Sequence, residues 1–155
     1  MDEAVARSLA RWPNVPAVYG WLELDRRGNW RIKGERIGNA ALRDFISRNY
    51  DWDAQGRWFF QNGPQRVYVT LAYTPFVVHF EQDALLDHCG RAFLAQETYV
   101  DEEGSVLLAQ QGRIALLDDR DLGRYADSGE HLPRLAKSEI PARFGFVQRP
   151  ADSLR

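Results

Sequence analysis

The segment Asp51-Trp52-Asp53-Ala54-Gln55-Gly56 has the spacing with which a calcium-binding loop begins. Such a loop places oxygen ligands at alternate positions, a glycine at the sixth position and a bidentate glutamate at the twelfth. Here the fifth position is Gln55 and the twelfth is Asn62, so two of the expected carboxylates are missing. The segment therefore predicts a hairpin turn closed by an aspartate rather than a metal site.

The side chains that could bind a soft metal or act as a nucleophile are few and poorly spaced. They are His79, His88, Cys89 and His131, and they show no Cys-x-x-Cys or His-x-x-x-His spacing. No zinc site is therefore predicted, and Cys89 is interpreted as a small buried hydrophobic residue. A single cysteine cannot form an internal disulfide and favours a reducing compartment, so we expect a cytoplasmic protein.

Acid/base chemistry needs titratable groups held at a defined distance. The second half of the chain offers Glu97, Asp101, Asp118, Asp119 and Asp121, but their spacing fixes no such distance. There is also no Gly-x-Ser-x-Gly motif and no glycine-rich phosphate loop. We predict no catalytic residue, no metal and no cofactor. An enzyme with an acid/base site between two halves of the chain is kept as the alternative.

Aromatic residues are the strongest sign of a binding surface. The run Trp58-Phe59-Phe60 must send aromatic groups to both faces of one strand. Trp, Tyr and Arg are also the residue types that dominate binding hot spots. The binding residues that we predict are Trp58, Phe60, Arg66, Tyr68 and Tyr73. Some of these aromatic side chains are expected to stay solvent-accessible in an isolated monomer or to be covered by a symmetric partner. The competing interpretation is that the aromatics fill a core.

One turn motif, Asp-x-x-Gly, occurs between apolar or aromatic residues three times. The copies are Asp25-Arg26-Arg27-Gly28, Asp53-Ala54-Gln55-Gly56 and Asp101-Glu102-Glu103-Gly104. The aspartate accepts hydrogen bonds from amides further along the turn, and the glycine adopts a positive φ without a Cβ clash. The motif predicts antiparallel hairpins with positive φ at all three glycines.

The elements around these turns predict an α+β fold. Alternating residues over 65–72 are typical of a strand, and one amphipathic helix is expected over 37–49. Its apolar stripe comprises Ile37, Ala41, Leu42, Phe45 and Ile46. We expect an antiparallel sheet with this main helix in residues 1–82, followed by a second antiparallel β-rich unit with short helices in residues 83–155.

Charge is distributed unevenly, although the net charge is only −2. Residues 81–130 carry four Lys or Arg against twelve Asp or Glu. An acidic middle argues against nucleic-acid binding, which needs a concentrated cationic surface. No apolar run approaches the length of about 20 residues that a membrane span requires. We therefore predict neither nucleic acid nor membrane as a partner.

A longer pattern resembles a known family. It begins with Gly28-x-Trp30-x-x-x-Gly34-x-x-Ile37-x-x-x-x-Leu42-x-x-Phe45 and continues with Gly56-Arg57-Trp58-Phe59-Phe60, Arg66-Val67-Tyr68-Val69 and Thr74-Pro75-Phe76-Val77. Over residues 20–80 this resembles the N-terminal part of a bacterial family, domain of unknown function 1285. The resemblance implies a bacterial origin and an N-terminal sheet with one helix, followed by a β-rich half. It implies no activity.

These observations favour a non-enzymatic binding or protein-interaction module. The binding site would be the aromatic sheet surface or a groove between the halves. The expected partner is an unidentified protein or small molecule, and a homodimer is left open.

Overall fold

The computed structural model describes residues 1–126 and 131–151 and shows two compact units. Unit 1 comprises Met1–Asp25, Asn29–Ala72 and the segment that begins at Phe146. Unit 2 comprises Arg26–Gly28 and Tyr73–Gly145. The chain thus crosses from unit 1 into the larger segment of unit 2 after Ala72, earlier than the expected domain boundary after residue 82. The division into domains 1–82 and 83–155 stays a prediction.

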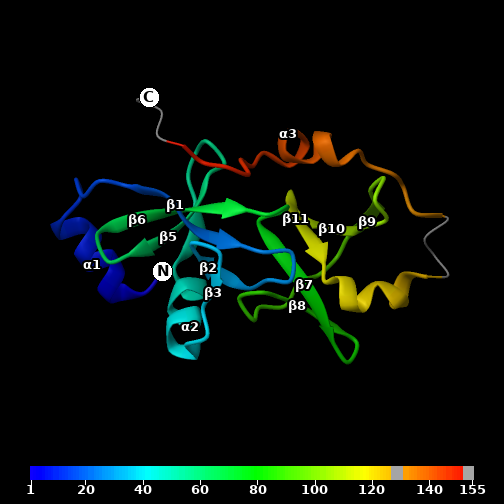
Figure 1. Cartoon of the computed structure of the whole chain (residues 1–155), viewed down its shortest axis with the longest axis horizontal. Helices are drawn as coiled ribbons and strands as arrows, with labels where there is room; N and C mark the ends of the chain where they lie inside the picture. The colour runs from blue at the N-terminus through cyan, green and yellow to red at the C-terminus, as the bar shows by residue number, and fades with distance from the viewer. Residues whose placement is uncertain (127–130, 152–155) are drawn as a thin grey trace. The chain divides into compact units, whose positions relative to one another are not determined.

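The described part of unit 1 contains a six-stranded sheet with the order β3-β2-β1-β6-β5-β4 (Figure 1). Its elements are α1 (Glu3–Arg11), β1 (Val18–Leu24), β2 (Trp30–Ile32), β3 (Glu35–Arg36), α2 (Ala40–Arg48), β4 (Tyr50–Trp52), β5 (Trp58–Asn62) and β6 (Gln65–Leu71). Neighbouring strands are antiparallel except for β1 and β6, which are parallel. The sheet is therefore mixed rather than purely antiparallel, because residue alternation does not encode the direction of the neighbouring strand.

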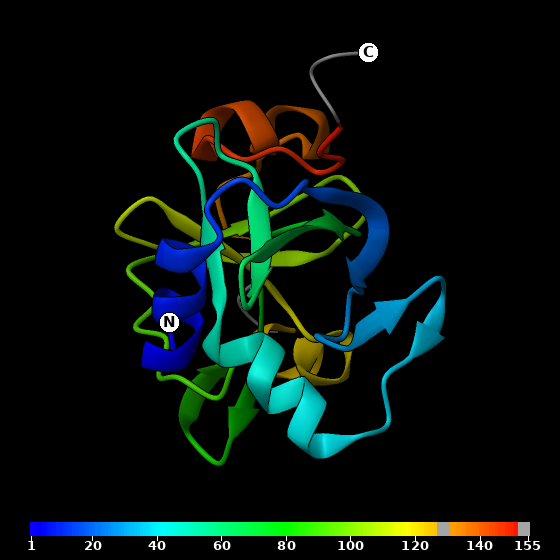
Figure 2. The same cartoon turned by 90° about the vertical axis from the view of Figure 1, so that its left-hand side faces the viewer.

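Helix α2 is the main helix that the sequence predicts, shortened at both ends of the expected range 37–49. It begins after Asn39, whose side chain accepts a hydrogen bond from a backbone amide of the first turn at 3.0 Å. The helix packs against β5 (Figure 2). Ser47 lies on its buried side and accepts a hydrogen bond from the indole nitrogen of Trp30 at 3.0 Å. This bond satisfies the polar atom of a tryptophan that is almost fully buried.

The described part of unit 2 contains a five-stranded sheet with the order β8-β7-β11-β10-β9. Its elements are β7 (Phe76–Glu81), β8 (Ala84–Asp87), β9 (Glu97–Val100), β10 (Val106–Gln110), β11 (Arg113–Leu117), η1 (Asp119–Tyr125), η3 (Lys137–Glu139) and α3 (Ile140–Phe144). Strands β7 and β11 are parallel and the other neighbours are antiparallel. The α+β class with short helices in the second unit is confirmed, again with a mixed sheet.

The three predicted Asp-x-x-Gly turns are confirmed. The φ angles of Gly28, Gly56 and Gly104 are 80°, 77° and 80°. In each turn the aspartate accepts a hydrogen bond from the amide four residues on, at 2.8 Å from Asn29, 3.0 Å from Arg57 and 2.9 Å from Ser105. The segment Asp51–Asn62 accordingly forms the β4–β5 hairpin.

A fourth turn of the same kind is Asp87-His88-Cys89-Gly90, which the sequence analysis missed. The Asp87 carboxylate accepts hydrogen bonds from the amides of Cys89 and Arg91 at 2.9 and 3.0 Å, and φ of Gly90 is 83°. The signal was available, because the spacing is identical to that of the other three copies. The turn fixes His88 and Cys89 in a loop after β8, where neither belongs to a strand or a helix.

Replacing Gly28 with Ala is expected to lower the free energy of unfolding by about 2–4 kcal/mol, against about 1–2 kcal/mol for Gly104→Ala. Both glycines have φ of 80°, so both variants place a Cβ in the left-handed region. At Gly28 the new Cβ would lie 2.9 Å from the Cβ of His88, whereas nothing lies within 4 Å of it at Gly104. Urea unfolding followed by far-UV circular dichroism measures both losses. Equal losses would contradict the close approach at Gly28.

Candidate binding site

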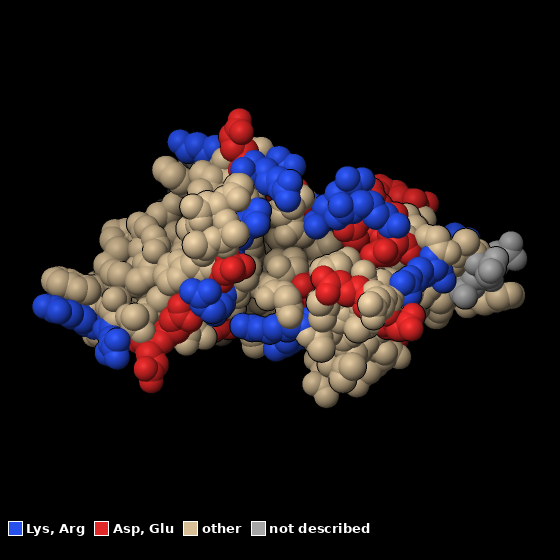
Figure 3. Space-filling model, turned by 90° about the horizontal axis from the view of Figure 1, so that it is seen from below, with Lys and Arg blue, Asp and Glu red and all other residues tan. Residues whose placement is uncertain are grey.

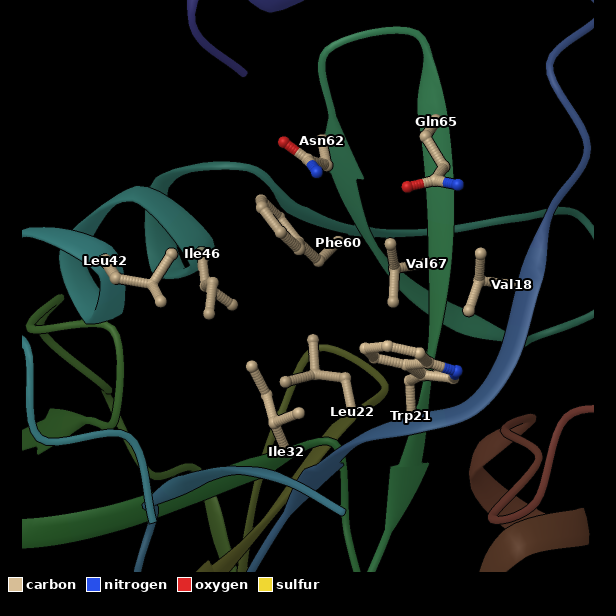
Figure 4. Close-up of a pocket in the computed structure, with 10 residues that line it drawn as sticks. All are labelled: Val18, Trp21, Leu22, Ile32, Leu42, Ile46, Phe60, Asn62, Gln65 and Val67. Atoms are coloured by element: carbon tan, nitrogen blue, oxygen red, sulfur yellow. The ribbon is translucent and has the colours of Figure 1, made fainter. Parts of the chain in front are cut away.

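Unit 1 contains an apolar pocket of about 370 Å³ between α2 and strands of the sheet (Figure 4). Its lining residues are Val18, Trp21, Leu22, Ile32, Leu42, Ile46, Phe60, Asn62, Gln65 and Val67. Figure 4 shows Leu42 and Ile46 entering from α2, with the strand residues opposite them. None of the lining residues carries a charge. The pocket therefore suits an apolar group and disfavours an isolated ion.

An irregularity in β1 places two consecutive residues on the pocket. The register of β1 against β6 shifts between Val18, which pairs with Val67, and Leu22, which pairs with Val69. Such a bulge bends a strand and redirects its side chains. The shifted stretch contains Gly20, where φ is 74°. As a result Trp21 and Leu22 both line the pocket, although neighbouring residues of a regular strand point to opposite faces.

Two large apolar side chains of the pocket are substantially exposed. Trp21 keeps 51% of its surface accessible and Leu42 keeps 38%. The ammonium group of Lys33 lies 4.5 Å from the centre of the Trp21 ring and so covers part of its surface. An occupant of the pocket would remove the remaining apolar surface from water, which is a favourable change in free energy.

Most of the binding residues predicted from the sequence lie outside the lining of this pocket. The expectation that some of the four aromatics stay exposed is wrong for the described chain, because Trp58, Phe60, Tyr68 and Tyr73 are 8%, 6%, 4% and 2% accessible. Arg66 packs its guanidinium 3.8 Å from the centre of the Phe59 ring. Of the five predicted residues, Phe60 lines the pocket.

The burial has a simple cause, since aromatic partners cover both faces of the sheet. On one face the Phe60 ring packs edge-on against Phe45 of α2, with centres 5.6 Å apart. On the other face the Tyr68 ring stacks on Tyr19, with centres 4.8 Å apart. Sequence reasoning missed Trp21, although a glycine inside a predicted strand is a known sign of a bulge.

The β4–β5 turn holds a partly buried hydrogen-bond network around Asp53. Asp53 accepts hydrogen bonds from the Tyr68 hydroxyl at 2.9 Å and from Nε of Arg57 at 2.8 Å. Burial alone would raise the pKa of Asp53, but the hydrogen bonds from Arg57, Tyr68 and the turn amide of Gln55 lower this pKa overall. The Asp53 carboxylate is thus hydrogen-bonded by Arg57 and Tyr68 of the same chain.

A second pocket, of about 200 Å³, lies within unit 2. Its lining residues are Arg27, Gly28, Val77, His79, His88, Asp118 and Arg120. The convergence of His79 with a carboxylate is the arrangement that an acid/base enzyme would need. However, Asp118 is 3% accessible and is bound by Arg120 at 2.6 Å. Burial alone would raise the pKa of Asp118, but its hydrogen bonds with Arg120 lower this pKa overall.

His88 is a further titratable group of this second pocket whose pKa is displaced. Burial of its ring, with a smaller contribution from the positive charge of Arg91, lowers its pKa to about 3. The amide of Val77 donates a hydrogen bond to its Nδ1 at 3.3 Å. At neutral pH His88 is therefore neutral and Asp118 is ionised, and neither pKa lies near the pH at which general acid/base catalysis is efficient.

The remaining predicted acid/base carboxylates have structural partners in the described chain. The Glu97 and Asp101 carboxylates accept hydrogen bonds from the hydroxyls of Tyr99 and Tyr73, the second at 2.7 Å. Asp119 accepts one from Arg27 at 3.0 Å, and Asp121 accepts one from the backbone amide of Phe80 at 2.9 Å. Within residues 1–126 and 131–151, no group of three or more His, Cys, Asp or Glu side chains is placed to hold a metal ion. The acid/base site between the halves stays a prediction.

The predicted partners are not decided by these contacts. The face drawn in Figure 3 carries Lys and Arg side chains next to Asp and Glu. Across the described ranges, no helix is both long and apolar enough to cross a membrane. The exclusion of nucleic acid and membrane, the cytoplasmic location and the homodimer stay predictions.

Comparison with known proteins gives a family and a fold. A family model described as "Protein of unknown function (DUF2946)" matches residues 1–151. No curated protein matches the sequence. A DUF1285 family protein from Silicibacter pomeroyi DSS-3 has a similar crystal structure, with 18% identity, a TM-score of 0.55 and coverage of 82% of this chain and 78% of that chain. A DUF1285 family protein from Shewanella baltica OS155 has 14% identity and a TM-score of 0.46, over 68% of this chain and 90% of that chain. The first of these likenesses confirms the predicted resemblance to domain of unknown function 1285 at the level of the fold.

Proposed function

We propose that this chain, which belongs to the family described as "Protein of unknown function (DUF2946)", is a non-enzymatic binding module whose site is the apolar pocket of unit 1. The observation that carries the proposal is the composition of this pocket. It combines an uncharged lining with two large side chains, Trp21 and Leu42, that remain exposed to solvent. Surfaces of this kind commonly mark binding sites rather than unused core.

The size of the pocket supports the same function. Its volume of about 370 Å³ falls at the lower end of the range of 300–1,000 Å³ that is typical of ligand sites. Tryptophan is also the residue type most enriched among binding hot spots. The occupant would therefore be an apolar group of moderate size that covers Trp21 and packs against α2.

The pocket of unit 2 supports an enzyme less well. It brings His79 and Asp118 together, but the pKa values of Asp118 and His88 are both displaced downward, away from neutrality. Catalysis by proton transfer favours groups whose pKa lies near the working pH. The enzyme stays the alternative hypothesis.

Replacing Leu42 with Arg is expected to weaken the binding of a neutral apolar probe, N-phenyl-1-naphthylamine, by about tenfold or more. The substitution puts a charge at the mouth of the pocket, and burying a charge without a partner is costly. Ala41→Arg is the matched control, because Ala41 is the preceding residue of α2, is exposed and does not line the pocket. Probe fluorescence and the emission of Trp21, identified by comparison with Trp21→Phe, measure the binding.

A probe that binds the wild type, Ala41→Arg and Leu42→Arg proteins with the same affinity would show that the pocket is not the site. Loss of binding in both Arg variants would point to a general effect of charge on α2. Either result contradicts the proposed location.

A further inference from the structure

Two carboxamide side chains, Asn62 and Gln65, line one end of the apolar pocket (Figure 4). They come from β5 and β6, where the two residues are direct partners beside the hairpin turn. Asn62 is exposed and Gln65 is partly exposed. In the described part of the chain, neither side-chain amide hydrogen-bonds another residue. Both groups are therefore available to an occupant of the pocket.

The chemistry of a carboxamide limits what these groups recognise. Each carries an N–H donor and a carbonyl acceptor, which is the same complement of groups that a peptide bond carries. With no charged residue in the lining and a lysine, Lys33, already stacked on the Trp21 ring, an ammonium group would enter without a compensating partner. The polar end of the pocket therefore fits a neutral group that both donates and accepts hydrogen bonds.

The exposure at the mouth favours an occupant that is larger than the pocket. Trp21 and Leu42 leave 51% and 38% of their surface accessible, so apolar surface continues from the pocket onto its rim. An occupant that fills the pocket with one side chain and continues across the mouth would cover both residues. A polypeptide has this form.

Building on the proposed function, we infer that the pocket binds a peptide segment of a partner protein. The segment inserts one large apolar side chain against Phe60 and Ile46, and its neighbouring peptide groups hydrogen-bond to Asn62 and Gln65. The uncharged lining with Lys33 beside it disfavours a positively charged amino terminus at this site, so the segment inserts as neutral chain. The inserted side chain supplies affinity through apolar burial, and the two carboxamides fix the direction of the main chain.

The test compares two small probes that differ in their peptide groups. Toluene represents a phenylalanine side chain, and N-acetyl-L-phenylalanine methylamide adds two peptide groups to it. Amide chemical shifts of the ¹⁵N-labelled full chain give the affinity for each probe and the location of binding. The peptide-like probe is expected to bind the wild type about tenfold more tightly than toluene, since it gains two neutral hydrogen bonds.

The double variant Asn62→Leu/Gln65→Met removes the carboxamides from these exposed positions. It is expected to bind both probes with the same affinity, so the tenfold preference disappears while toluene binding persists. Gln55→Met is the matched control, because Gln55 lies in the exposed turn between β4 and β5 and does not line the pocket. This control is expected to keep the full preference.

Each other outcome is decisive. If toluene binds in the pocket and the peptide-like probe binds no better, or if the double variant keeps the preference, the peptide inference is overturned and the apolar binding function stands. If neither probe shifts the pocket residues, both the inference and the proposed function fail. If the wild type self-associates and Leu42→Arg abolishes this association, a second copy of the chain is the occupant. That result would overturn the inference that the occupant belongs to a partner protein.

Discussion

Replacing Asp101 with Ala is expected to lower the free energy of unfolding of unit 2 by about 3–5 kcal/mol. Asp101 is 1% accessible, and its carboxylate accepts three hydrogen bonds. Two come from the amides of Glu103 and Ser105 at 2.9 Å, and one comes from the hydroxyl of Tyr73 at 2.7 Å. Alanine leaves the buried Tyr73 hydroxyl and the two partly buried turn amides without this acceptor, and hydrogen bonds to a charged group are the stronger ones.

Two further variants separate the contributions to this loss. Tyr73→Phe removes one donor and is expected to cost about 1–2 kcal/mol. Asp101→Asn keeps an oxygen that accepts both turn amides, and it is expected to restore most of the stability that Asp101→Ala loses. The pKa of Tyr73 is raised, mainly by burial and then by its hydrogen bond to Asp101, so Asp101→Ala should also lower the pH at which Tyr73 ionises.

The measurement can distinguish the two units. All five tryptophans, at positions 12, 21, 30, 52 and 58, lie in segments of unit 1. Tryptophan emission during urea unfolding therefore follows unit 1, while far-UV circular dichroism follows both units. Asp101→Ala is expected to shift the circular dichroism transition to lower urea. A variant as stable as the wild type by both signals would show that the buried carboxylate is dispensable.

The turns were predictable because their chemistry is local. An aspartate and a glycine three residues apart satisfy the turn amides and allow a positive φ, whatever the rest of the chain does. The same reasoning applies to Asp87 and Gly90, where inspection of the sequence overlooked a copy that the structure places after β8. The α+β class follows from these turns together with the periodicity of α2.

The candidate site was not predictable in the same way because its causes are tertiary. Trp58 and Phe60 have the composition of a hot spot, but Phe45 and other aromatics cover them in the folded unit. Trp21 is exposed in a stretch of β1 where the register against β6 shifts between Val18 and Leu22. A glycine within a strand signals that a bulge is available. It does not indicate which neighbouring side chain the bulge will turn toward a pocket.

Lowering the pH from 6.5 to 4.5 is expected to remove about 2–3 kcal/mol of stability through His88. Its pKa is about 3 in the folded chain and about 6.5 when unfolded. Between these values the unfolded chain takes up a proton that the folded chain excludes. The contribution is therefore complete above pH 6.5 and falls as the pH drops toward 3, by about 1.4 kcal/mol per pH unit.

The physical cause lies in the surroundings of the ring. His88 Nε2 is buried, and Nδ1 accepts the hydrogen bond from Val77, which a protonated ring could not accept. The charged or titratable residues around the same pocket are Arg27, His79, Asp118 and Arg120, and Arg91 adds positive charge. Asp118 is already paired with Arg120 at 2.6 Å.

His88→Gln tests this prediction, with His79→Gln as the matched control at a more exposed position of the same pocket. The free energy of unfolding of each protein is measured by urea titration at pH 6.5, 5.5 and 4.5. The wild type and His79→Gln are expected to lose stability steeply over this range, and His88→Gln is expected to lose about 2–3 kcal/mol less. Loss of stability from carboxylates such as Asp53 begins near pH 4 and is common to all three proteins, so it cancels in the comparison. If His88→Gln shows the same pH dependence as the wild type, the ring of His88 is open to protonation in the folded chain, and the turn at Asp87–Gly90 does not hold it neutral.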